Sequence, residues 1–414
     1  MNTLATKTAA PSPETLFRKL ISAAIACLLL AVSIGVLAYV TSRDHIANGD
    51  FIEYWAAGQL LVHGANPYDP NRISAMEVSA GRHREPALLY NPPLAVFLTL
   101  PLGVVRPRVG YVLWSLFILG AWLGSVHLLW IMNGRSRNAL HFIGFFFTPA
   151  LECFLLGQMV AFALLGITLF LYLYRKRPLF AGAALVLCLL KPHLFLPFWV
   201  VLLAWSVTRR AYRVVCGAGV SLAICCAVPL FFDPSIYSQY VAMAHISGVT
   251  HLFLPTLGAL LRFTVDPNAF WIQFLPAFIG CLWGFRYFYR RYETWDWYAH
   301  GSLLILVSFL VAPYAWFADA IILLPSIFYA AYRARPGALA GLVLLLAANG
   351  TQLLLLLTPL QSAAHPWATG PWLVWYLWPT VGWLVWYLWT MRGNPSFMTV
   401  DAFRASHAGM VRPE

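Results

Sequence analysis

The chain has 414 residues, of which 61% are apolar and only 10% are charged. Because soluble domains carry about 25% charged residues, this composition excludes an ordinary soluble protein, and the abundance of aromatic residues excludes a disordered chain. The net charge of +12 comes from basic residues in short clusters between apolar runs. That pattern follows the positive-inside rule and indicates contact with membrane lipids, not with nucleic acid. The predicted fold class is an all-α polytopic membrane protein.

The apolar runs predict a single transmembrane domain over residues 20–391, flanked by cytoplasmic tails at 1–19 and 392–414. The first run, at 20–40, has about the 20 residues that a helix needs to cross a bilayer, and a basic pair precedes it. Residues 41–90 are therefore predicted to form the first extracytoplasmic loop.

The later basic clusters mark cytoplasmic turns, and the runs between them predict about twelve transmembrane helices in total. The stretch at 91–132 departs from a simple alternation, because Arg106 and Arg108 interrupt it. Its two ends should lie on opposite sides of the membrane. Either one segment of this stretch is re-entrant, or the two arginines depart from the positive-inside rule.

Within the outer loop, residues 51–62 have the periodicity of a helix, with Phe51 and Trp55 on one stripe and Glu53 away from it. An aromatic stripe with little net charge is typical of a helix that lies in the membrane interface. Gly64 and the proline that follows it predict where this helix ends.

Polar and ionisable residues beside apolar runs are candidates for function, because placing them at membrane depth is costly. In the predicted topology these residues converge at the outward ends of the runs. They are Asp50, Glu53, Gln158, Lys191, His193, His245, His251 and Asp319. Such a group on one face of the membrane is a candidate site.

Two of these residues have competing interpretations. Asp50 precedes helix 51–62, so it is either the helix cap, with Glu53 completing a capping box, or a general base just outside the bilayer. Lys191 interrupts an apolar run beside a proline. It either snorkels to the outer interface or binds an anionic group such as a lipid phosphate. The residues alone leave both choices open.

Two further segments carry signals of their own. Gly157 and Gln158 lie between two apolar runs, which is typical of a turn. Residues 312–319 combine a proline, several aromatic residues and Asp319 between two runs. That composition is typical of an aromatic belt at the interface, in which the aspartate caps the next helix.

No metal or cofactor is predicted. The seven cysteines form no CxxC pair and have no zinc-binding spacing. The spacing of six between His245 and His251 matches no metal motif. The sequence contains no P-loop, dinucleotide-binding or nucleophile-elbow motif, and no Asp-x-Asp to hold the metal ion of a nucleotide sugar.

An ordered set of short motifs resembles glycosyltransferase family 87, whose members are related to the polyprenyl-phosphate-mannose-dependent mannosyltransferases. The motifs are Asp50-Phe51-x-x-Tyr54-Trp55, Gly64-x-Asn66-Pro67-Tyr68, Tyr90-x-Pro92-Pro93, Pro101-Leu102, Gly157-Gln158, Lys191-Pro192-His193 and Pro313-Tyr314-x-Trp316-x-x-Asp319. Together they cover most of residues 50–325.

The resemblance implies a GT-C-like bundle in the bacterial plasma (inner) membrane. It also implies an inverting hexosyl transfer, of mannose for example, on the extracytoplasmic side. The donor is then a polyprenyl-phosphate sugar and the acceptor a glycolipid or glycan, with Asp50 as catalytic base by motif position. We expect substrate contacts from Glu53, Tyr54, Tyr90, Gln158, Lys191, His193, His251, Tyr314 and Asp319.

Two other classes of protein remain as alternatives. A polytopic transporter or lipid flippase would also have broken helices and buried charge, and it predicts inverted repeats, which are not evident in the sequence. A non-enzymatic scaffold of an envelope-assembly complex would tolerate the substitution Asp50→Asn without loss of function.

Overall fold

The computed structural model describes most of the chain. The described residues are 46, 49–82, 89–135, 139–246, 254, 256–333, 338–357 and 371–392. Every regular element within these ranges is a helix, which confirms the predicted all-α class. The predicted N-terminal tail, the first apolar run at 20–40 and residues 393–414 of the predicted C-terminal tail lie outside the described residues.

Many of the helices are short, and several consist of a 3₁₀ turn (η) joined to an α-helix. In chain order the elements are α3 (Phe51–Val62), α4 (Pro70–Ala80), α5 (Pro93–Val96), η1 (Phe97–Val104), α6 (Pro107–Met132), η2 (Ala139–Phe142), α7 (Ile143–Phe146), α8 (Thr148–Leu156), α9 (Val160–Leu173), α10 (Pro178–Ala184), η3 (Leu185–Leu190), η4 (Pro192–Phe195), α11 (Leu196–Thr208), α12 (Tyr212–Phe232), α13 (Ile236–Ile246), α14 (Leu257–Val265), η6 (Phe270–Phe274), α15 (Leu275–Tyr289), α16 (Trp297–Leu310), η7 (Phe317–Leu323), α17 (Leu324–Ala331), α18 (Ala338–Leu357) and α19 (Pro371–Thr390). A proline stands in the first turn of α5, α6, α8, α10, η4, α11, α15 and α17. Proline lacks the N–H that an uninterrupted helix needs, so it opens a new helix at each of these points.

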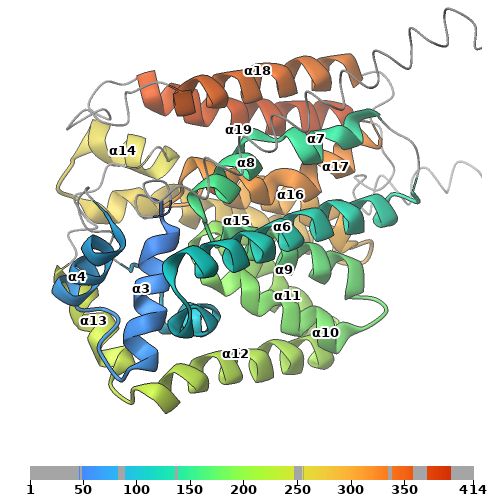
Figure 1. Cartoon of the computed structure of the whole chain (residues 1–414). Helices are drawn as coiled ribbons and strands as arrows, with labels where there is room; N and C mark the ends of the chain where they lie inside the picture. Colours follow the sequence, from blue (N-terminus) through green and yellow to red (C-terminus); the bar gives the residue numbers. More distant parts are fainter. Residues whose placement is uncertain are drawn as a thin grey trace, which may run out of the picture.

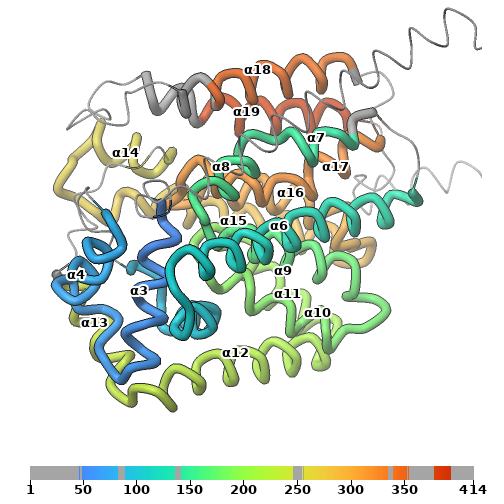
Figure 2. Tube along the Cα trace, viewed as in Figure 1, coloured from blue at the N-terminus to red at the C-terminus, as the bar shows by residue number. Residues whose placement is uncertain are grey.

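The long helices α6, α12, α18 and α19 run in roughly the same direction, and α3 stands across them at one end of the molecule (Figure 1). The trace shows α4, α13 and α14 at this same end (Figure 2). The basic turn between α9 and α10 lies at the opposite end, as does the end of α6. The acid-rich segment around α3 and the basic turns are therefore separated by the length of the bundle.

Among the described residues, α6 and α12 are the two helices that are both long enough and apolar enough to cross a membrane unaided. Seven shorter apolar segments have 10–17 residues each, such as Val160–Leu173 and Trp297–Leu310. The segments predicted as crossings are thus largely present as helices. The total of about twelve crossings stays a prediction.

The length of the segment formed by α5 and η1 bears on whether part of residues 91–132, the stretch interrupted by Arg106 and Arg108, is re-entrant. With rises of about 1.5 Å per α-helical and 2.0 Å per 3₁₀ residue, its twelve residues span about 22 Å, less than the roughly 30 Å of a hydrocarbon core. Arg106 then directly precedes α6, which is one 26-residue helix. This geometry favours the re-entrant alternative, with α6 as the single crossing.

Helix α3 has the predicted bounds, and Gly64 follows its end with φ of +70°. Its expected position in the membrane interface stays a prediction, but its burial is not confined to the aromatic stripe. Nine of its twelve residues are buried within the protein. Its closest neighbour is η1: a Cβ on Gly58 would lie 2.3 Å from the carbonyl oxygen of Thr99, and a Cβ on Gly103 would lie 2.4 Å from that of Gly58. Only glycines allow the two backbones to approach this closely.

Candidate active site

Asp50 stands at the start of α3 but does not cap it. Its backbone lies in the helical region, and its side chain makes no capping hydrogen bond, so the capping interpretation is wrong. The backbone N–H of Asp50 donates to the carbonyl of Leu156 at 2.9 Å. The side-chain amide of Gln158 donates to the carboxylate oxygen Oδ2. The carboxylate is thus directed away from its own helix and toward the turn after α8.

That turn is the predicted Gly157-Gln158 turn, and its geometry requires glycine. Gly157 ends α8 with φ of +76°, a conformation that side chains strain. A Cβ there would also lie 2.8 Å from the Cβ of Phe51. The indole N–H of Trp114 donates to the carbonyl of Gly157 at 2.7 Å. The start of α3 and the end of α8 are therefore packed in direct contact, which places Gln158 beside Asp50.

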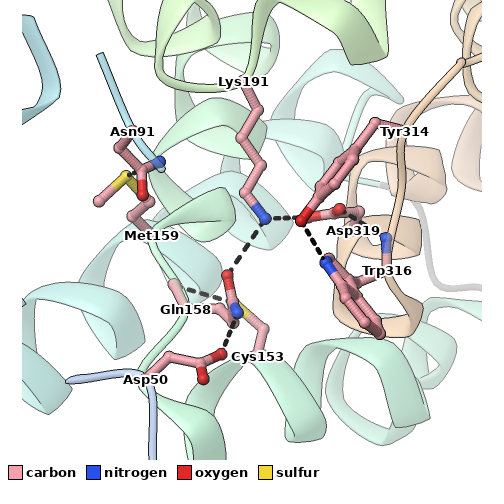
Figure 3. Close-up of polar contacts among 9 residues, drawn as sticks. All are labelled: Asp50, Asn91, Cys153, Gln158, Met159, Lys191, Tyr314, Trp316 and Asp319. Atoms are coloured by element: carbon pink, nitrogen blue, oxygen red, sulfur yellow. Dashed lines mark hydrogen bonds and ion pairs between the residues drawn. The ribbon is translucent and has the colours of Figure 1, made fainter. Parts of the chain in front are cut away.

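Lys191 lies between η3 and η4, where the helix is broken, and it is only 6% exposed. Its ammonium nitrogen Nζ is 2.6 Å from Oδ1 of Asp319 and 3.1 Å from Oε1 of Gln158 (Figure 3). A snorkelling lysine would extend its ammonium group to water. The buried ion pair shows that this interpretation is wrong, and binding of an anionic ligand by Lys191 stays a prediction.

Asp319 makes two contacts, one with each oxygen. Oδ1 pairs with Lys191, and Oδ2 accepts a hydrogen bond from the backbone N–H of Trp316 at 2.8 Å. The predicted capping role of Asp319 is therefore confirmed, since this bond closes the first turn of η7. The indole N–H of Trp316 donates to the hydroxyl of Tyr314 at 2.7 Å, and the ring of His193 meets that of Tyr314 edge to face, with centroids 5.2 Å apart.

These contacts form one continuous polar chain, from Asp50 through Gln158 and Lys191 to Asp319 and the backbone of Trp316 (Figure 3). Burial raises the pKa of Asp50, while its hydrogen bond with Gln158 and the charges of Lys191 and Arg82 act in the opposite direction. The net effect is a carboxyl group that takes up a proton more readily than an aspartate in water.

Two other predicted residues lie near this chain. Burial and repulsion by the charges of Asp50 and Glu77 raise the pKa of Glu53 well above its usual value. Tyr90 is 36% exposed, and burial together with the charge of Glu53 raises the pKa of its hydroxyl. Tyr90 is thus both partly exposed and close enough to Glu53 for the two groups to interact.

The remaining predicted residues are not brought to the chain of contacts. Tyr54 is 1% exposed, and its ring packs against Trp114, so it supports the core of the site. His245 is exposed at the end of α13. His251 lies outside the described residues.

Glu152 is a site residue that the sequence reasoning missed. It lies on α8, is 6% exposed, and has no hydrogen-bond or ion-pair partner among the described residues. The charges of Asp319 and Asp50 act on its carboxyl group across the site. An acid inside an apolar run is the signal used for the other candidates, and the same criterion would have found this residue.

A second network holds the segment that carries Tyr314 and Asp319. The guanidinium of Arg262 donates to Oε1 of Gln273 at 3.1 Å, and Nε2 of Gln273 donates to the carbonyl of Pro313 at 2.6 Å. The hydroxyl of Thr256 reaches the same carbonyl at 3.4 Å. These groups on α14 and η6 fix the break between α16 and η7, from which the site residues extend.

No group of three or more His, Cys, Asp or Glu side chains arranged to hold a metal ion occurs in the described part of the chain.

A helical bundle with a buried acid–amide–lysine–acid chain at one end is an arrangement suited to binding and deprotonating a polar substrate within a membrane. The chain belongs to glycosyltransferase family 87, whose model matches residues 89–359. The match confirms the resemblance and includes Gln158, Lys191 and Asp319, whereas Asp50 precedes it. No curated protein and no solved structure matches the chain. Its family makes it a glycosyltransferase, and its apolar helices make it a membrane protein.

Proposed function

We propose that the protein transfers a hexose, such as mannose, from a polyprenyl-phosphate sugar to a glycolipid or glycan acceptor, with inversion at the anomeric carbon. The observation that carries this proposal is the carboxylate of Asp50. It caps no helix, it is held in a defined direction by Gln158, and it lies two contacts from a buried cation.

In the proposed step, an acceptor hydroxyl oxygen attacks the anomeric carbon of the donor sugar. The bond between that carbon and the phosphate oxygen breaks, and its electron pair stays on the polyprenyl phosphate. The hydroxyl proton passes to Asp50, which returns it to water after the product leaves. A single base is sufficient, because inversion needs no covalent intermediate.

Lys191 is the group that we assign to the leaving phosphate. The described residues account for two of its three N–H donors, namely those directed at Asp319 and Gln158. The third is available to a phosphate oxygen, on which negative charge develops as the bond breaks. A donor carried by a lipid also suits a site whose walls are mainly apolar helices.

Four further side chains are placed to contact the sugars. Glu53 lies near Asp50 and Tyr90, and His193 lies near Lys191 with its ring against that of Tyr314. Nε2 of His193 is buried without a hydrogen-bond partner among the described residues, which leaves it available to a ligand. We place the site on the extracytoplasmic side of a bacterial plasma membrane, at the end of the bundle that is remote from the basic turns.

The proposal can be tested with the full-length protein reconstituted in lipid vesicles. The donor is radiolabelled polyprenyl-phosphate mannose, and the acceptor is a glycolipid extract of the host membrane. We expect label to move into the glycolipid fraction, and NMR of the product to show the inverted anomeric configuration. Transfer that persists in Asp50→Asn would contradict the assignment of the base. Movement of the donor between leaflets without any transfer would instead support the flippase alternative.

A further inference from the structure

We infer that Gln158 is a positioning residue that orients the carboxylate of Asp50, and that Lys191 determines the orientation of the side-chain amide of Gln158. This inference rests on the proposed function, since it assigns Gln158 to the base and not to the substrate. It replaces the sequence-based expectation that Gln158 contacts substrate.

The chemistry of the neighbouring groups fixes the orientation of the amide. An ammonium group only donates hydrogen bonds and a carboxylate only accepts them. Lys191 Nζ must therefore meet the oxygen of the Gln158 amide, and Asp50 must meet its NH₂ group. The flipped amide would direct N–H groups at the cation and an oxygen at the carboxylate, so both contacts would be repulsive.

Each end of this arrangement is itself held. Asp319 fixes Lys191 at 2.6 Å and is in turn fixed by the backbone N–H of Trp316 at 2.8 Å. The backbone of Gln158 is tied to α8, because its N–H donates to the carbonyl of Cys153 at 2.9 Å and the Cys153 thiol donates to its carbonyl at 3.2 Å. The amide thus has little freedom to rotate, and its direction is transmitted to Asp50.

The consequence lies in the second oxygen of Asp50. Oδ2 accepts from Gln158, whereas no described residue donates a hydrogen bond to Oδ1. Gln158 therefore leaves one defined oxygen for the acceptor hydroxyl. Its amide oxygen and one N–H of its amide nitrogen are engaged by Lys191 and Asp50, which is why we place it behind the base.

The test uses Gln158→Met, which keeps the length of the side chain but removes the amide. The matched control is Gln239→Met on α13, away from the site. There the side-chain amide donates a hydrogen bond of 2.7 Å to the carboxylate of Asp233. We expect kcat of Gln158→Met to fall about 10–100-fold, as for loss of a hydrogen bond to a charged group, with KM for the donor unchanged. Gln239→Met should retain the wild-type kcat.

The pH profile separates a positioning role from a structural one. Because the Gln158 hydrogen bond lowers the pKa of Asp50, its loss should move the acid limb of kcat/KM to higher pH. Gln158→Glu, which keeps the acceptor for Lys191 but presents a second carboxylate to Asp50, should move that limb further. This second variant also serves if Gln158→Met does not fold.

An unchanged acid limb in the variant that folds would overturn the inference, and so would a rise in KM alone, which would mean that Gln158 contacts substrate. These outcomes require an active wild-type protein. A wild-type protein without transfer activity would instead contradict the proposed function, so the two failures are distinguishable.

Discussion

Lys191 and Asp319, which are 128 residues apart in the chain, form an ion pair of 2.6 Å whose side chains are 8% and 0% exposed. Such a pair is seldom a net source of stability, because removing two charges from water offsets most of their attraction. Its effect here is to hold a cation in an apolar bundle at one position. That position is next to Gln158 and, through it, to the carboxylate of Asp50.

Asp50→Asn should lower the rate of sugar transfer by about 10²–10⁴-fold, the usual loss on removing a general base, while the protein still folds. Asn remains polar and similar in size, so the packing at the start of α3 is kept. Asp69→Asn is the matched control, because Asp69 caps α4 through the backbone of Asn71 and Asn caps equally well. Radiolabel transfer in vesicles measures both variants. Equal rates for Asp50→Asn and the control would mean that another group takes the proton.

The transfer rate should fall as pH decreases, with an acid limb above the ordinary Asp pKa of about 3.9. Burial raises the pKa of Asp50, and a base acts only when deprotonated, so activity is present above this raised pKa and lost below it. The positive charge of Lys191 lowers the pKa of Asp50, and the negative charge of Asp319 raises it. Lys191→Met removes the first effect and leaves the carboxylate of Asp319 without its partner. The acid limb of the residual activity should therefore move to higher pH. A limb at the same pH in both proteins would show that another group controls it.

Lys191→Met should destabilise the protein by about 3–5 kcal/mol, because it leaves the carboxylate of Asp319 buried without a counter-charge. Adding Asp319→Asn should recover most of that stability, since Asn neutralises the charge and keeps an acceptor for Trp316 N–H. Thermal unfolding in detergent measures both effects. Donor binding and transfer should remain low in the double variant. Recovery of activity together with stability would mean that Lys191 has only a structural role.

Gly157→Ala should disrupt the contact between α8 and α3, because it places a Cβ 2.8 Å from that of Phe51 at a φ of +76°. Gln158 would then shift away from Asp50, so we expect a large loss of activity and a lower melting temperature. Gly120→Ala on α6 is the control, since a Cβ there meets nothing within 4 Å. It should be neutral or slightly stabilising, as alanine is the better helix former. Similar melting temperatures for the two variants would contradict this account of the turn.

A cysteine at Ser79, which is exposed near the end of α4, should react with an impermeant maleimide in intact cells. The prediction follows from placing residues 41–90 outside the cytoplasm. Thr208→Cys at the end of α11, beside the basic turn at Arg209, should react only after the inner membrane is permeabilised. The reverse pattern would place the site on the cytoplasmic side and exclude a donor presented from outside.

The sequence predicted local structure well where a periodic pattern and helix-ending residues agreed, as for α3 and for the turn at Gly157. It failed where tertiary contacts decide. The pattern on α3 indicated one aromatic stripe, whereas in the structure nine of its twelve residues are buried, partly through the Gly58–Gly103 contact with η1, which no local pattern reveals. Likewise, the spacing of Asp50 and Glu53 fits a capping box, and only the fold turns Asp50 toward Gln158 instead.

For the site, the sequence identified Asp50, Gln158, Lys191 and Asp319 as separate candidates, because each is polar beside an apolar run. Which of them meet could not be derived, since the contacts join segments up to 128 residues apart. The choice between snorkelling and anion binding for Lys191 depended on a partner that the local sequence does not contain. Glu152 was missed because it belongs to no motif.

The order of synthesis gives the Lys191–Asp319 pair a consequence for biogenesis. Lys191 leaves the ribosome 128 residues before its partner, which at roughly 5–20 residues per second is a delay of about 6–26 s. During that interval the site groups that precede Lys191 in the chain, Gln158 and Asp50 among them, are already synthesised. The ion pair therefore forms only after η7 has been synthesised, and until then Lys191 stands in the break between η3 and η4 without this partner.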